Sequence, residues 1–248
     1  MINPLVLVLE GLSLFCLTVV SISLFLLYIQ KKDLPPMLMG IAYSITGIIV
    51  SLYIIEGLFE PPTDFLGLNA LFTKLPLLLL ILGPSFMWLF KLEVFDDGIR
   101  ANQLKVILYS FFTSIYIIVM VIDIIDPAEY TADLIAGIIL LTIALMSYAL
   151  GTYLISLMSI LPKYENRNYR VKSQFLLLSL LAYIFCIGWV IIITALWNVF
   201  NVPGALDYDW VAWIGLALSS ILAFFSFSIP KAIQIRLGLI ESEIKSEK

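Results

Sequence analysis

Seven long apolar stretches separated by short polar segments dominate this chain of 248 residues. A helix rising about 1.5 Å per residue needs roughly 20 apolar residues to cross the hydrocarbon core of a bilayer. The stretches that meet this need are Leu5–Tyr28, Met37–Ile55, Ala70–Phe90, Val106–Ile125, Leu134–Ile160, Phe175–Val199 and Val211–Ile229. Each is expected to be helical, because a backbone in lipid must satisfy its own N–H and C=O groups. The sequence therefore predicts an all-α integral membrane protein, a seven-transmembrane helix bundle.

The composition supports the same interpretation. Only 13% of the residues are charged and 62% are hydrophobic, whereas about a quarter are charged in soluble domains. The apolar stretches are continuous and do not alternate as transmembrane β-strands do. The connections between them span about 8 to 15 residues, which leaves no room for a separate ligand-binding or catalytic domain. We expect one membrane domain, 1–230, followed by a short cytoplasmic tail, 231–248.

Basic residues lie on one side of the apolar stretches. Of the 14 Lys and Arg residues, only Lys74 falls outside the connections after the first, third and fifth stretches and the tail. The remaining connections, 59–69, 126–133 and 200–210, carry acidic residues and no basic residue. Because basic loops stay on the cytoplasmic side, the sequence predicts a multi-pass protein of the cell membrane. Its amino terminus is expected outside and its carboxyl terminus in the cytoplasm.

The absence of histidine argues against an enzyme. A chain with no His lacks the usual general base, zinc ligand and haem ligand. Cys16 and Cys186 lie in apolar stretches without a C-x-x-C partner, and no phosphate-binding loop or nucleic-acid motif is present. A covalent retinal would need a lysine within Val211–Ile229, which contains none. We expect a non-enzymatic protein without metal or cofactor and without a nucleic-acid partner.

Four ionisable residues lie within about two turns of the outer ends of the first four stretches. They are Glu10, Glu56, Lys74 and Asp123. Ionisable groups inside spans are rare and are candidates for function, so these residues form the predicted ligand-binding site, with Lys74 as the counter-ion of the carboxylates. They can also simply reach the interface. If the pocket exists, Lys74→Ala should destabilise the bundle more than Lys91→Ala, which is expected to remove only a charge on the cytoplasmic face.

The third stretch is interrupted by proline. Pro76 and the pair Gly83–Pro84 each place a missing backbone donor inside the helix, which bends it. Such a bend is either a hinge or a fixed shape. Pro76, Gly83 and Pro84 are the candidate hinge residues.

Small residues recur along one face of three stretches, as close helix packing in lipid favours. They are Gly40, Ser44, Gly47 and Ser51 in the second stretch, Ser147 and Gly151 in the fifth, and Ala212, Gly215, Ser219 and Ala223 in the seventh. We expect these faces to be buried against other helices, of this chain or of another. Gly47→Leu should therefore disturb packing more than Ile48→Leu.

The tail has the pattern of an amphipathic helix. Its apolar residues recur at helical spacing opposite charged ones. They are Ile233, Leu237, Ile240 and Ile244. This face is a candidate docking element for a cytoplasmic partner; the alternative is a solvated end.

The segment Leu71–Phe95 reads LFTKLPLLLLILGPSFMWLFKLEVF. It resembles the third span of the amino-terminal seven-helix sensor region of many histidine kinases, in which a lysine near the outer end precedes a proline and an aromatic, acid-bearing exit. The matching positions are Lys74, Pro84, Trp88, Phe90 and Glu93. The opening Asn3–Pro4 and the seven-span topology are similar too. The chain carries no kinase domain, so the resemblance implies a stand-alone sensor module that acts on a separate partner.

These observations favour a seven-transmembrane sensor or receptor-like signalling protein that passes an outer-side or membrane signal to a cytoplasmic partner. A structural subunit of a larger membrane complex is the first alternative, and a transporter or channel for a small solute is the second. The expected partners are the lipid bilayer, a cytoplasmic signalling protein or other membrane subunits, and a second copy of the chain.

Overall fold

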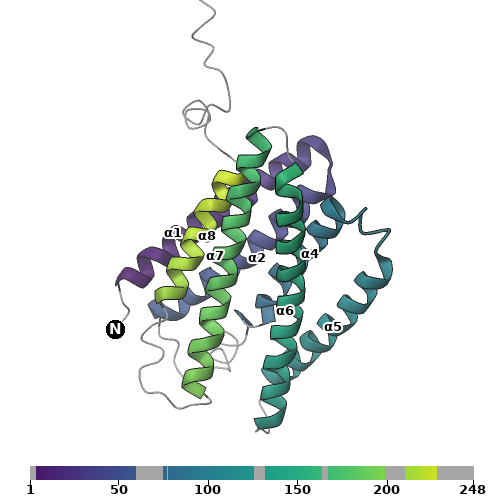
Figure 1. The fold of residues 1–248 in the computed structure, drawn as a ribbon. Helices are drawn as coiled ribbons and strands as arrows, with labels where there is room; N and C mark the ends of the chain where they lie inside the picture. The colour runs from purple at the N-terminus through teal and green to yellow at the C-terminus, as the bar shows by residue number, and fades with distance from the viewer. Residues whose placement is uncertain are drawn as a thin grey trace, which may run out of the picture. The chain divides into compact units, whose positions relative to one another are not determined.

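The computed structural model describes residues 4–59, 75–76, 78–125, 132–163, 167–198 and 210–227, all of them in helices or in the turns between helices (Figure 1). The helices are α1 (Pro4–Lys31), α2 (Leu34–Phe59), α4 (Leu82–Phe95), α5 (Gln103–Ile125), α6 (Ala132–Ile160), the short 3-10 helix η1 (Leu161–Lys163), α7 (Arg167–Asn198) and α8 (Trp210–Phe227). Within these ranges seven helices are long and apolar enough to cross a membrane, α4 being counted from Leu78. The all-helical, seven-span prediction is confirmed at this level, and it indicates a multi-pass membrane protein.

The chain divides into two compact units. The first, Met1–Ser156, contains α1, α2, α4, α5 and most of α6, and the second, Leu157–Lys248, contains the end of α6 with α7 and α8. The predicted boundary between 1–230 and the tail lies outside the described residues.

In the first unit, α1 and α2 form an antiparallel pair joined by Lys32 and Asp33 alone. Lys32 has a left-handed backbone with φ 61°, which reverses the chain before the prolines at the start of α2. At Gly40 an added Cβ would lie 3.2 Å from the Phe25 ring. At Gly47 it would lie 3.8 Å from a methyl carbon of Leu14. Gly40 therefore allows α1 to approach closely, whereas at Gly47 an added Cβ would make ordinary contact.

The helix α4 packs against α2 and is buried on nearly all sides. Its first turn follows an interruption of the helical hydrogen bonding, here called the break: residues 78–80 are helical, Ile81 keeps helical dihedrals (φ −82°, ψ −26°), and α4 begins at Leu82. Pro84 has no N–H to donate to the carbonyl of Leu80, which explains an interruption at this place. The candidate hinge residues Gly83 and Pro84 are buried in α4, and Pro76 is buried in the short helical piece before it.

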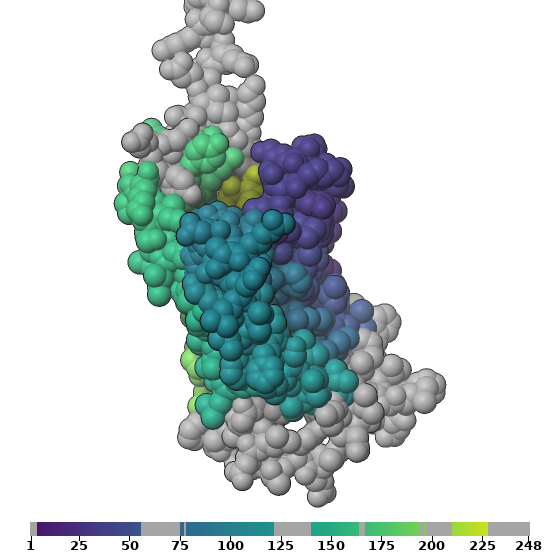
Figure 2. All heavy atoms as spheres, turned by 90° about the vertical axis from the view of Figure 1, so that its right-hand side faces the viewer, coloured from purple at the N-terminus to yellow at the C-terminus, as the bar shows by residue number. Residues whose placement is uncertain are grey.

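The helix α5 buries a mostly polar stripe and exposes many large apolar side chains. Its buried face is the stripe Tyr109, Thr113, Tyr116 and Met120. Its exposed face includes Leu104, Ile107, Leu108, Phe111, Phe112, Ile115 and Ile118, and this is the face turned toward the viewer in Figure 2. A helix in water has the opposite arrangement, so α5 suits a lipid environment.

In the second unit, α7 and α8 pack along their lengths. A Cβ at Gly215 would meet the Phe185 ring at 3.1 Å and the Cβ of Cys186 at 3.3 Å. The Ser179 hydroxyl donates to the backbone carbonyl of Ser219 at 2.8 Å. Small residues of α8 thus face α7, with Ala212, Gly215, Ser219 and Ala223 buried.

Candidate functional site: a charged turn beside an aromatic cluster

Of the four ionisable residues predicted to form an outer pocket, the structure describes the side chain of Glu10. It is 6% exposed and takes part in a polar interaction. Lys74 and the side chains of Glu56 and Asp123 lie outside the described residues, as do the tail residues Ile233, Leu237, Ile240 and Ile244.

The remaining predicted packing residues differ in their surroundings. Ser44 and Ser51 are half-buried on α2, and the Ser51 hydroxyl donates to the carbonyl of Gly47 at 2.9 Å. On α6, Ser147 is exposed and a Cβ at Gly151 would meet nothing within 4 Å. Gly151 itself is half-buried.

Lys91 corrects one expectation. Lys91 was expected to contribute only a charge to the cytoplasmic face. Its side chain is 9% exposed, however, and its ammonium is paired with the carboxylate of Asp96. The reason is that Lys91 belongs to the last two turns of α4 and points back into the unit. Asp96 follows the end of α4 and brings its carboxylate to the ammonium. Partial burial makes this pair more important for stability than an exposed one.

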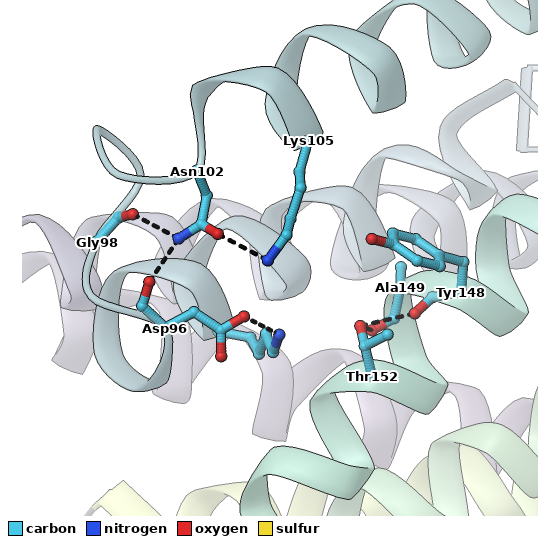
Figure 3. Close-up of polar contacts among 8 residues, drawn as sticks. Asp96, Gly98, Asn102, Lys105, Tyr148, Ala149 and Thr152 are labelled. Atoms are coloured by element: carbon cyan, nitrogen blue, oxygen red, sulfur yellow. Dashed lines mark hydrogen bonds and ion pairs between the residues drawn. The ribbon is translucent and has the colours of Figure 1, made fainter.

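The turn between α4 and α5 is held by side chains (Figure 3). The Asn102 amide donates to the backbone carbonyls of Asp96 and of Gly98, the latter at 2.9 Å. The Lys105 ammonium donates to the Asn102 side-chain oxygen at 2.8 Å. On the other side of the turn, the Glu93 carboxylate accepts the N–H of Ile99 at 2.9 Å. The turn is therefore fixed from both α4 and α5.

The backbone of the turn also needs special conformations. Asp97 and Gly98 have φ values of 61° and 93°, in the region that Gly, Asn and Asp tolerate best. The carbonyl of Leu92 accepts the N–H groups of Asp96 and Gly98 at 3.3 and 3.0 Å, which closes the end of α4.

An aromatic cluster joins α4 to α5 and α6. The fully buried Trp88 stacks on Tyr109 with ring centroids 4.4 Å apart, and Tyr148 of α6 lies 5.9 Å from Trp88. Nearer the turn, Phe95 stacks on Tyr153 of α6 at 6.1 Å. Phe90 meets Tyr153 edge-on at 5.9 Å. Such pairs contribute roughly 0.5–1.5 kcal/mol each beyond the area they bury.

The cluster reaches the break in α4 through hydroxyl groups. Ser85 donates its hydroxyl to the carbonyl of Ile81 at 2.7 Å, and its oxygen lies 3.1 Å from the Tyr109 hydroxyl. Since the single Ser85 hydrogen goes to Ile81, Tyr109 is the donor in the second bond. A buried hydroxyl of α5 is thus connected to the first turn after the break.

No group of three or more metal-ligating side chains occurs among the described residues. What the first unit offers is a single helix, α4, with a break near one end, an aromatic cluster along its length and a fixed charged turn at the other end.

Two sequence signals point to features that hydropathy alone missed. Tyr109, Thr113 and Tyr116 recur at helical spacing, which marks the inner face of α5. The dipeptide Asp97–Gly98 is typical of a tight turn. The partnership of Lys91 with Asp96 has no comparable signal.

Comparison of the chain with protein-family models, with curated proteins and with solved structures finds no match.

Proposed function

We propose that this protein is a seven-transmembrane sensor or receptor-like protein of the cell membrane. It passes an outer-side or membrane signal to a cytoplasmic partner and has no enzymatic activity. Its amino terminus lies outside and its carboxyl terminus in the cytoplasm, because the basic residues gather on that side. In this orientation the α4–α5 turn is cytoplasmic and the break in α4 lies toward the outer side.

The observation that supports this proposal is the order of structural features along α4. Along it, the break at Ile81, the Trp88–Tyr109 stack and the Lys91–Asp96 pair follow one another within about four turns. Packed cores move between discrete arrangements and do not deform continuously. A change of the α4 axis at the break would be carried by the buried side chains to the charged turn.

The mechanism is a shift between two arrangements of the bundle. A ligand, or a change in the bilayer, stabilises one arrangement only to the extent that it binds or fits that arrangement better. The buried Glu10, in the outer half of α1, is the described residue best placed to sense an outer signal. The cytoplasmic turn and the tail are the surfaces that a partner would bind.

A role as an assembly subunit is the alternative, and it would use small-residue faces that are free for permanent docking. Gly40, Gly47 and Gly215 face Phe25, Leu14 and Phe185 of this same chain, so the α2 and α8 faces pack within the chain. On α6, Ser147 is exposed and a Cβ at Gly151 would meet nothing within 4 Å, so this is the face that such docking would use.

Photocrosslinking from the tail tests the proposal. A photoreactive amino acid is placed at Leu237, on the predicted apolar face, and in a second variant at Glu241, on the charged face. In native membranes, Leu237 should crosslink to one soluble cytoplasmic protein and Glu241 should not. Crosslinks to membrane subunits alone, or equal products from both positions, would reject a docking tail.

A further inference from the structure

The backbone around the break in α4 lacks the restraints of an ordinary helix. Pro84 removes one hydrogen bond, and Gly83 supplies no side chain that would resist a change of direction. The conformation at this point therefore depends on contacts from neighbouring helices. The described contacts of this region with α5 are those of Ser85 and Trp88, and α4 also packs against α2.

Ser85 joins the first turn of α4 to α5. Its N–H and its hydroxyl both donate to the carbonyl of Ile81, at 3.1 and 2.7 Å. Its oxygen then accepts from Tyr109, whose ring stacks on Trp88 one turn further along α4. Tyr109 of α5 thus contacts the first two turns of α4, through a hydrogen bond with Ser85 and through ring stacking on Trp88.

We propose that Tyr109 is a latch on α4: its hydroxyl, bonded to Ser85, holds one of two arrangements of the helix at the Ile81–Pro84 break. Release of this bond lets α4 change direction while the Trp88 stack keeps it in contact with α5. One interhelical hydrogen bond in a membrane is weak, so the ligand or bilayer change needed to release it is modest. The inference rests on the proposed function for its physiological role.

Tyr109→Phe removes the hydroxyl and keeps the ring, and Tyr148→Phe is its matched control. Both side chains belong to the aromatic cluster around Trp88. Hydrogen exchange of α4 is measured on the purified full chain in lipid nanodiscs. We expect Tyr109→Phe to raise exchange in peptides covering 81–90 about threefold, the factor typical of one such bond, and Tyr148→Phe to leave it unchanged.

A distance measurement separates a latch from local packing. In a background with Cys16 and Cys186 replaced by Ser, spin labels are placed at Ile48 of α2 and Val94 of α4, both exposed. Tyr109→Phe and, separately, Ser85→Ala should add a second distance to the distribution, and Tyr148→Phe should not. A single unchanged distance in both Tyr109→Phe and Ser85→Ala overturns the latch even if exchange accelerates. Neither experiment needs a partner, so failure of the latch is distinguishable from failure of the proposed function.

Discussion

The ammonium of Lys91 pairs with the carboxylate of Asp96 across the end of α4, and the lysine is the more buried partner of the two. The consequence for mutation is asymmetric. Removing the carboxylate leaves a buried positive charge without its partner, whereas removing the lysine leaves a carboxylate that water can reach in part.

We therefore expect Asp96→Asn to lower the free energy of unfolding by about 2 kcal/mol, between the values for exposed and fully buried pairs. The adjacent, exposed Asp97 is the control: Asp97→Asn should be neutral, since Asn also tolerates the left-handed backbone. Thermal unfolding in detergent measures both. The charge swap Lys91→Asp with Asp96→Lys should recover part of the loss, and equal melting temperatures for Asp96→Asn and Asp97→Asn would show that the pair contributes nothing.

Asn102 joins both sides of the same turn. Asn102→Ala removes its two bonds to backbone carbonyls and the acceptor of Lys105, and should destabilise the turn by roughly 1–2 kcal/mol. Gln103→Ala, at an exposed neighbour, is the control. Hydrogen exchange of 96–103 should accelerate in the first variant and not in the second. The same slow exchange in both would mean that the backbone alone fixes the turn.

The two glycines of the α7–α8 region that the structure describes should respond oppositely to alanine. At Gly215 a Cβ would meet the Phe185 ring at 3.1 Å and the Ala182 carbonyl oxygen at 3.4 Å, whereas at Gly188 nothing lies within 4 Å. Gly215→Ala should lower stability by about 1 kcal/mol through overpacking. Gly188→Ala should raise it slightly, because alanine is the better helix former. Thermal unfolding of the two variants measures both effects. A higher melting temperature for Gly215→Ala than for the unchanged protein would contradict the close approach of α7 and α8.

Position 47 tests the α1–α2 contact by size. A Cβ there would lie in ordinary contact with Leu14 and Leu17, at 3.8 and 3.9 Å, so Gly47→Ala should fit. Gly47→Leu should cost roughly 1–3 kcal/mol. Ile48→Leu, at a side chain 50% exposed, should change stability little. If Gly47→Leu unfolds at the same temperature as Ile48→Leu, Gly47 does not face α1.

The helices were predictable because length and apolarity decide what crosses a bilayer. The residues at which the helices begin and end were less predictable. The first helix runs to Lys31 and α5 begins at Gln103, beyond the predicted Tyr28 and before the predicted Val106, because backbone hydrogen bonding continues after the apolar residues stop.

The charged turn and the aromatic cluster could not be predicted from the sequence, for a different reason. Lys91 follows a span, as exposed interfacial lysines do, and only the path of the chain after Phe95 brings Asp96 to it. Trp88 and Phe111 are both apolar residues within spans, yet Trp88 is buried and Phe111 is exposed. In lipid, hydrophobicity does not distinguish an inner face from an outer one.

Affinity purification from native membranes in mild detergent tests the sensor proposal most directly. The full chain is compared with a chain ending at Pro230, and the stoichiometry of every co-purifying protein is measured. The proposal predicts a cytoplasmic signalling protein that accompanies the full chain and is lost from the shortened one. Recovery of both chains in the same fixed-stoichiometry membrane assembly, with no such protein, would contradict it.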